Sequence, residues 1–292
     1  MDGPIQAPAE ASTPPPFLLE RPPLQAAPLV LASPHSGRHY PASFLAASRL
    51  DPVSLRRSED GFVEELFADA PSHGVPLLSA TFPRVYCDAN REAWELDPGM
   101  FDGPLPDFVN SASPRVGAGL GTIARVVASG ETVYRRRLSF NEAADRIRAL
   151  WEPYHAALSG LIGETVRRFG CCLLIDCHSM PSLPGEPGRA ADMILGDAHG
   201  TSAGPRATRL LEETLGGLGY RLRRNDPYAG GYVTRHYGRP REGVHVIQLE
   251  IARSLYMDER RIQRLPGLEG LRADMDRMVQ RLAAEDWSFL KP

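Results

Sequence analysis

Short apolar runs alternate along this chain with segments in which apolar residues have helical spacing. Bounded apolar runs predict buried β-strands at residues 29–31, 74–82, 171–176 and 243–252. Apolar residues three and four positions apart predict helices over 60–70, 142–169, 205–216 and 268–284. Strands that alternate with helices favour an α/β fold, in which helices cover both faces of a mainly parallel sheet.

Two of these helices carry boundary signals. Asp60 stands at or just before the first turn of the segment 60–70. The apolar face of this segment consists of Phe62, Val63, Leu66, Phe67 and Ala70. Within 142–169, Pro153 is expected to kink or interrupt the helix, because proline lacks the backbone donor that a helix interior needs. Gly170 is a suitable terminator.

The first 28 residues differ from the rest of the chain. They contain eight prolines and few groups that could pack, which predicts an extended tail or a surface strap. No linker or composition break follows, so we expect residues 29–292 to form one domain.

Composition narrows the classes of partner. The hydrophobic fraction of 42% is ordinary for a globular protein, and a formal net charge of −3 favours neither nucleic acid nor an anionic membrane. Three of the four cysteines crowd one apolar segment, without disulfide or zinc spacing, and are expected to be buried thiols. Without a leader-like start or a run long enough to span a bilayer, the chain is expected to be cytoplasmic.

Candidate chemistry gathers where predicted strands end. His35, His178 and Glu250 each follow or close an apolar run. In open α/β sheets, ligands bind outside the carboxyl ends of the strands, so these three residues could converge. Imidazole and carboxylate groups suit zinc, whose catalytic sites use three protein ligands. Alternatively, each histidine hydrogen-bonds backbone at a strand end, which would be the better interpretation of one such histidine alone.

The stretch "RVYCDANRE" brings three polar residues together. Asp88, Asn90 and Arg91 supply a carboxylate, an amide and a guanidinium within four positions. Arginine offers a planar bidentate fork to a carboxylate, so the cluster could hold an acidic substrate. An ion pair between Asp88 and Arg91 that stabilises a loop explains the same residues equally well.

The segment "NDPYAGGYVTRHYG", residues 225–238, is rich in glycine, tyrosine and polar side chains. This composition is typical of a loop that approaches a ligand closely, and it makes Asn225, Arg235 and His236 candidate substrate contacts. A hairpin with exposed aromatic residues is the alternative.

Several long motifs in order resemble the N-formylglutamate amidohydrolase (N-formylglutamate deformylase) family. They are "SPHSG", "DANRE", "LIDCHSMPS", "ILGD", "NDPYAGGYVTRHYG" and "IQLEIARSLYM", with "ED" before "FVEELF". The resemblance spans residues 29 to about 260. It implies a three-layer fold similar to zinc carboxypeptidases and aspartoacylases, with a central mixed, mainly parallel sheet between helices.

The resemblance also implies roles for residues. His35 and His178 would bind zinc, and Glu250 would be the general base. Arg38 stands where the carboxypeptidase pattern has a glutamate ligand, so the third ligand is expected to be Asp60, with Glu59 as the competitor. Asn90 and Arg91 would bind the carboxylate side of the substrate, an N-acylated acidic amino acid.

The implied reaction is hydrolysis of N-formyl-L-glutamate to formate and glutamate, as in histidine degradation. Arg91 and Arg235 would hold the two carboxylates. Two alternatives remain: a metal-dependent amidase or carboxypeptidase-like hydrolase with another N-acyl substrate, and a catalytically silent protein of the same fold that binds a carboxylate.

Overall fold

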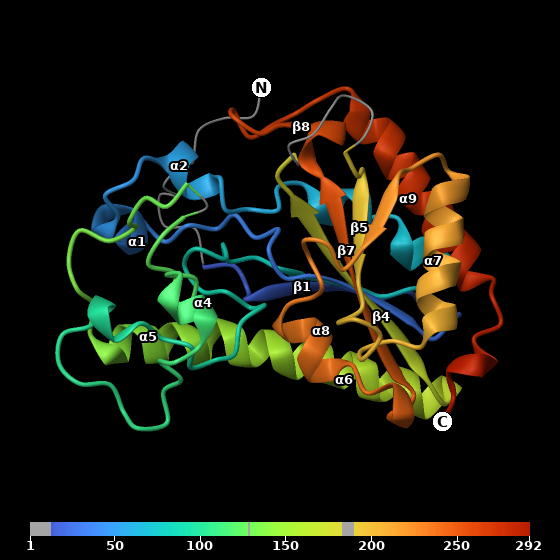
Figure 1. Cartoon of the computed structure of the whole chain (residues 1–292), viewed down its shortest axis with the longest axis horizontal. Helices are drawn as coiled ribbons and strands as arrows, with labels where there is room; N and C mark the ends of the chain where they lie inside the picture. Colours follow the sequence, from blue (N-terminus) through green and yellow to red (C-terminus); the bar gives the residue numbers. More distant parts are fainter. Residues whose placement is uncertain (1–12, 128, 183–189) are drawn as a thin grey trace.

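A seven-stranded sheet forms the centre of the computed structural model, which describes residues 13–127, 129–182 and 190–292 (Figure 1). The strands are β1 (Phe17–Glu20), β2 (Leu29–Ser33), β3 (Leu77–Ala80), β4 (Cys172–Met180), β5 (Met193–Gly196), β6 (Leu222–Arg224) and β7 (Val244–Ala252). Their spatial order is β1-β3-β2-β4-β7-β5-β6. The pairs β1–β3 and β5–β7 are antiparallel and the other four pairs are parallel, which confirms a mixed, mainly parallel sheet.

Helices cover both faces of this sheet. They are α1 (Ala42–Ala47), α2 (Pro52–Arg56), α3 (Val63–Leu66), α4 (Pro114–Gly117), α5 (Phe140–Arg146), α6 (Glu152–Phe169), α7 (Pro205–Gly217), α8 (Tyr232–Tyr237) and α9 (Gly267–Ala283). One apolar core joins α3, α7 and α9 to the sheet, and a second joins α6 and α8 to the opposite face. In Figure 1, α6 runs along the bottom and α7 and α9 stand at the right. A small ribbon of β8 (Met257–Asp258) and β9 (Gln263–Arg264) precedes α9.

The two nine-residue strands β4 and β7 bring polar residues to one face of the sheet. Successive side chains of a strand point to opposite faces. Leu173, Ile175 and Cys177 therefore join the core beneath α9. Leu174 faces α6, and the alternation carries Asp176 and His178 onto that same face. The strand thus continues four residues beyond the predicted end at 176, so that His178 lies inside it.

Two other predicted elements differ in extent. The helix predicted over 60–70 is regular only over α3, because Phe62 has a left-handed backbone with φ of 66° just before it. Its five apolar residues are nevertheless buried, as predicted. Residues 17–20, which were assigned to the proline-rich tail, instead form the edge strand β1.

The long helical segment is interrupted before Pro153. Residues Ile147–Trp151 form a π-helical turn between α5 and α6, and Pro153 occupies the first turn of α6. A wider turn accommodates the missing proline N–H, so the predicted interruption is present. Gly170 ends α6 with φ of 81°.

All four cysteines are free and buried, as expected. Among the helices of the described residues, none combines the length and the apolar character that crossing a bilayer requires.

Candidate active site

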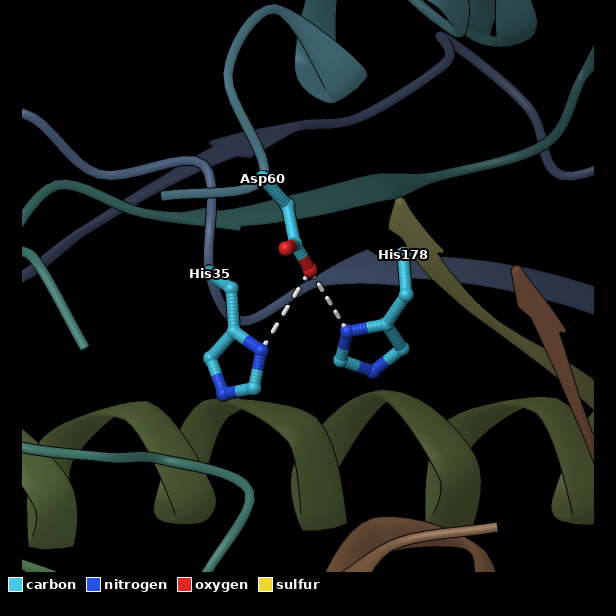
Figure 2. Close-up of side chains that lie close together, drawn as sticks. All are labelled: His35, Asp60 and His178. Carbon is cyan, nitrogen blue, oxygen red and sulfur yellow. Dashed lines mark hydrogen bonds and ion pairs between the residues drawn. The ribbon is translucent and has the colours of Figure 1, made fainter. Parts of the chain in front are cut away.

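His35, Asp60 and His178 form a buried cluster where three segments meet (Figure 2). His35 lies in the turn after β2, Asp60 lies before α3, and His178 lies in β4. A hydrogen bond of 3.0 Å from the Asp60 N–H to the His35 carbonyl joins the first two segments. Asp60 Oδ2 lies 3.4 Å from His35 Nδ1 and 2.9 Å from His178 Nδ1. Each residue therefore presents one metal-ligand atom to a common point.

The far nitrogen of each imidazole contacts a second aspartate. His35 Nε2 lies 2.7 Å from Asp88 Oδ1, and His178 Nε2 lies 3.0 Å from Asp176 Oδ2. Because an ionised carboxylate only accepts hydrogen bonds, each Nε2 atom can donate to its aspartate while Nδ1 holds a metal ion. This leaves the two Nδ1 atoms facing Asp60. Carboxylates in this arrangement orient histidine ligands in metal sites.

Although Asp60 and His178 are buried, each stabilises the charged form of the other. Burial opposes ionisation of Asp60, but the neighbouring imidazoles of His178 and His35 hold its pKa well below the usual range. Burial would lower the pKa of His178, yet Asp176 and Asp60 raise it well above the usual value. In addition, Arg253 Nη2 donates to Asp60 Oδ1 at 3.1 Å, which fixes the orientation of this carboxylate.

The donor set fits one divalent metal ion. The three ligand atoms lie within 4.8 Å of one another, and two imidazoles with a carboxylate are a common catalytic zinc set. His35 Nδ1 is buried and has no hydrogen-bond partner, which is unusual for a polar atom unless a ligand completes the site.

Glu59, the alternative third ligand, points elsewhere. Its carboxylate accepts a hydrogen bond of 2.7 Å from the Tyr40 hydroxyl. Arg56 Nε lies 3.1 and 3.2 Å from its two oxygens. The structure therefore brings Asp60 and not Glu59 to the two histidines.

Glu250 lies beside His178 on the neighbouring strand. The two residues are register partners in the parallel pair β4–β7, so both side chains stand on the α6 face of the sheet. Only 7% of Glu250 is exposed, and burial raises its pKa to about 7, although His178 opposes this shift. Gln248 Nε2 donates to Glu250 Oε1 at 2.8 Å. A carboxylate with a raised pKa beside a candidate metal site suits a general base.

Two cavities of about 260 and 290 Å³ open onto this cluster. Asp60 and Asp88 line the first, and His35 and His178 line the second. Five residues line both, namely Arg84, Arg91, Arg115, Tyr228 and Glu250. A ligand in either cavity would therefore meet guanidinium groups and Glu250 together, which favours an anionic ligand.

Asn90 joins the second cavity to the first turn of α8. Its Oδ1 accepts a hydrogen bond of 2.8 Å from the Val233 N–H, and its Nδ2 lies 3.1 Å from His178 Nε2. Gly231 permits this approach, since a Cβ atom there would lie 2.4 Å from Asn90 Nδ2. Arg91 is 7% exposed and donates to the carbonyls of Leu120 at 2.9 Å and Asn90 at 2.7 Å.

Two predicted substrate contacts do not reach the cavities. Asn225 exchanges hydrogen bonds with Asp197, accepting from its N–H at 3.0 Å and donating to Oδ1 at 2.8 Å. His236 is exposed and stacks on Tyr232 at a ring-centroid distance of 4.7 Å. Neither lines the two cavities, so the geometry gives no support to a substrate contact for them. Arg235 does line the second cavity, where it bonds the Gly230 carbonyl.

The sequence interpretation missed Arg84, Arg115, Tyr228 and Arg253. Arg84 Nη2 lies 2.9 Å from Asp88 Oδ2, so the ion pair found among the described residues of this loop joins Asp88 to Arg84 and not to Arg91. Arg84, Tyr228 and Arg253 lie inside the quoted segments "RVYCDANRE", "NDPYAGGYVTRHYG" and "IQLEIARSLYM", which was an available signal. Arg115 lies in a segment without a motif, and only the tertiary structure brings it to the cavities.

Comparisons with known proteins identify the family of the chain. A family model for N-formylglutamate amidohydrolase matches residues 27–257. An N-formylglutamate deformylase of Pseudomonas aeruginosa is 30% identical over 239 residues, covering 80% of this chain and 83% of the relative. A Pseudomonas putida deformylase is 29% identical over 237 residues, covering 80% and 82%.

Solved structures show the same likeness. The crystal structure of N-formylglutamate amidohydrolase from Ralstonia eutropha superposes with a TM-score of 0.86 at 38% identity, covering 92% of this chain and 97% of that one. A gene product from Agrobacterium tumefaciens shares the fold, with a TM-score of 0.62 at 17% identity. The family match contains His35, Asp60, His178 and Glu250, so the chain that carries this cluster belongs to the N-formylglutamate amidohydrolase family.

Proposed function

We propose that this chain hydrolyses N-formyl-L-glutamate to formate and L-glutamate, using one zinc ion held by His35, Asp60 and His178. The main support for the metal site is that two imidazole Nδ1 atoms converge on Asp60. One of them, His35 Nδ1, has no hydrogen-bond partner among the described residues. The names of the Pseudomonas and Ralstonia relatives support the substrate. In histidine degradation this reaction would release glutamate.

The residues of the chain divide the chemistry between them. When bound by His35, Asp60 and His178, a zinc ion would supply Lewis acidity, which would acidify water and polarise the formyl carbonyl. Glu250 accepts the proton of the attacking water and returns it to the leaving amine nitrogen. Its raised pKa, about 7, suits both steps. Asp88 and Asp176 hold the histidines by Nε2, so that their geometry is set before substrate arrives.

Substrate orientation falls to the guanidinium groups. Arg91 lies beside Asn90 and His178 in the second cavity, where it can pair with the α-carboxylate next to the reacting amide. Arg235 is the second arginine proposed to hold a carboxylate, because it lines the same cavity. Fixing the substrate at two anionic groups restricts its rotation and places the formamide near Glu250.

Formate release from N-formyl-L-glutamate tests the proposal directly. We expect release by the metal-loaded protein, loss after treatment with a chelator, and recovery on adding Zn²⁺. N-acetyl-L-glutamate and an N-formyl derivative of an apolar amino acid serve as comparison substrates. Faster hydrolysis of another N-acyl amino acid would favour the related amidase. Binding of N-formylglutamate without hydrolysis or bound metal would favour a silent carboxylate-binding protein.

The choice between Asp60 and Glu59 gives a second test. Both carboxylates are almost fully buried, so Asp60→Asn and Glu59→Gln are matched, charge-removing changes. We expect Asp60→Asn to lose metal, because the amide is a poor zinc ligand. Glu59→Gln should keep metal, since the described partners of the Glu59 side chain are Tyr40 and Arg56 and not the two histidines. Elemental analysis measures the metal content of each variant, and circular dichroism checks that each is folded. If Glu59→Gln lost metal and Asp60→Asn kept it, Glu59 would be the third ligand.

A further inference from the structure

The backbone that carries Arg115 is held in place beside the two cavities. It lies in the short helix α4, whose N-terminus is capped by a bond of 3.2 Å from the Val116 N–H to Ser113 Oγ. The Leu120 N–H donates to the Arg115 carbonyl at 2.8 Å, and the Leu120 carbonyl accepts from Arg91 Nε at 2.9 Å. The backbone that carries Arg115 is therefore tied to the wall that carries Arg91.

A close backbone contact holds this segment against the loop 88–95. A Cβ atom at Gly121 would lie 2.2 Å from the Glu95 carbonyl oxygen, so only glycine allows the approach. On either side, the Thr122 N–H donates to that Glu95 carbonyl and the Asp88 N–H donates to the Thr122 carbonyl, both at 2.8 Å. Arg115 is thus presented by a docked segment, although its own side chain is exposed.

Arg115 differs from the other arginines that line both cavities. Arg84 pairs with Asp88, and Arg91 donates to two backbone carbonyls. Within the described ranges, the Arg115 side chain has neither an ion pair nor a hydrogen bond to the protein, and it faces both cavities. Its five N–H donors are available to a ligand.

The positive charge around Arg115 favours the binding of an anionic ligand. Burial lowers the pKa of Arg91, and the neighbouring charges of Arg84 and Arg115 lower it further, against the opposing effects of Asp88 and Glu95. Among the described residues that line the second cavity, four are arginines, Arg84, Arg91, Arg115 and Arg235, and Glu250 supplies the one carboxylate. A second negative group on the ligand would relieve this repulsion and pair with the free fork of Arg115.

We propose that Arg115, together with Arg235, binds the side-chain carboxylate of the substrate and thereby makes the site selective for acidic over neutral N-formyl amino acids. This inference rests on the proposed function. Arg91 is buried beside Asn90 and His178, where the α-carboxylate lies close to the reacting amide. Arg115 stands farther out, at the exposed mouth, which a side chain pointing away from the amide reaches.

Substrate pairs that differ only in the distal group test this role. N-formyl-L-glutamate and N-formyl-L-glutamine have nearly the same shape, but only the first carries the second negative charge. Arg115→Ala should lower kcat/KM for N-formylglutamate about 10- to 100-fold, mainly through KM, as expected for losing hydrogen bonds to a charged group. The preference for the glutamate over the glutamine substrate should fall by the same factor. Arg115→Lys should restore part of it, because lysine keeps the charge without the fork.

The matched control is Arg209→Ala, which removes an exposed arginine from α7 on the other face of the sheet. It should leave the preference unchanged. Equal losses for both substrates in Arg115→Ala, or an equal loss of preference in Arg209→Ala, would overturn the assignment.

A binding measurement separates this inference from the proposed reaction. Calorimetric titration with glutarate and with its monoamide requires no turnover. The wild type should bind glutarate more tightly, and Arg115→Ala should lose that preference. If the wild type hydrolyses no N-formyl amino acid, the proposed function fails, and this titration still decides the role of Arg115. A wild type without the preference, or a variant that retains it, contradicts the role.

Discussion

Replacing His178 by alanine is expected to remove the bound metal and with it all measurable turnover. The imidazole supplies one of three ligand atoms, and no other histidine in the described part of the chain lies within reach to replace it. Losing even a carboxylate that orients a histidine ligand costs roughly 10- to 100-fold in metal affinity, so losing the ligand should cost more. Elemental analysis of the purified variant and formate release measure the two effects.

The same change leaves Asp176 without its main partner. Asp176 is fully buried, and its Oδ1 has no hydrogen bond even in the intact protein. Breaking a buried ion pair destabilises a protein by about 3–5 kcal/mol, so a loss of folding must be distinguished from a loss of metal.

His245→Ala is the matched control, because His245 is also buried, in β7, and its hydrogen-bond partners among the described residues are backbone groups of Gly204 and Leu290. It should be less stable yet keep its metal. Stoichiometric metal in folded His178→Ala would contradict the ligand assignment.

Replacing Glu250 by glutamine should have the second largest effect, on rate alone. Glutamine keeps the shape of the side chain but cannot accept a proton from water. Turnover should fall by a factor on the order of 10² to 10⁴, the usual contribution of general base catalysis. Metal should stay bound, because Glu250 is not among the three converging ligands. Metal content and kcat measured on the same preparation separate this outcome from that of His178→Ala.

Glu59→Gln again provides the comparison, since it alters a buried glutamate that lines neither cavity. Near-normal turnover in Glu250→Gln would show that another group takes the proton, and the mechanism would be wrong.

Sequence patterns predicted the order and type of the main elements because their apolar periodicities are strong. They placed the end of β4 too early. Asp176 and His178 were interpreted as marking the end of a buried strand, whereas they continue its alternation on the α6 face. Polar residues can stay inside a strand here because Asn90, Asp60 and Glu250 supply partners from other segments, and no local pattern contains that information.

For the same reason, some residues of the candidate site were predicted correctly from the sequence and others were not. His35, Asp60, His178 and Glu250 were found through strand ends and family motifs, and the structure brings them together. Asn225 was chosen because its loop is polar, but its side chain is used by Asp197. The interactions that a polar side chain makes within its own loop decide whether it is available to a ligand, and composition does not reveal them.

The register of β4 against β7 has a consequence for how such a site can change. His178 and Glu250 are partners in a ladder of backbone hydrogen bonds, so their separation is set by the spacing of strands, about 4.8 Å. Arg115 and Arg235 stand on short helices outside that ladder. Insertions or substitutions around α4 and α8 can therefore exchange one substrate for another without displacing the proposed base from the proposed metal ligand. The strand ladder thus holds the proposed catalytic residues, whereas the arginines proposed to bind the substrate lie on segments that can change independently of it.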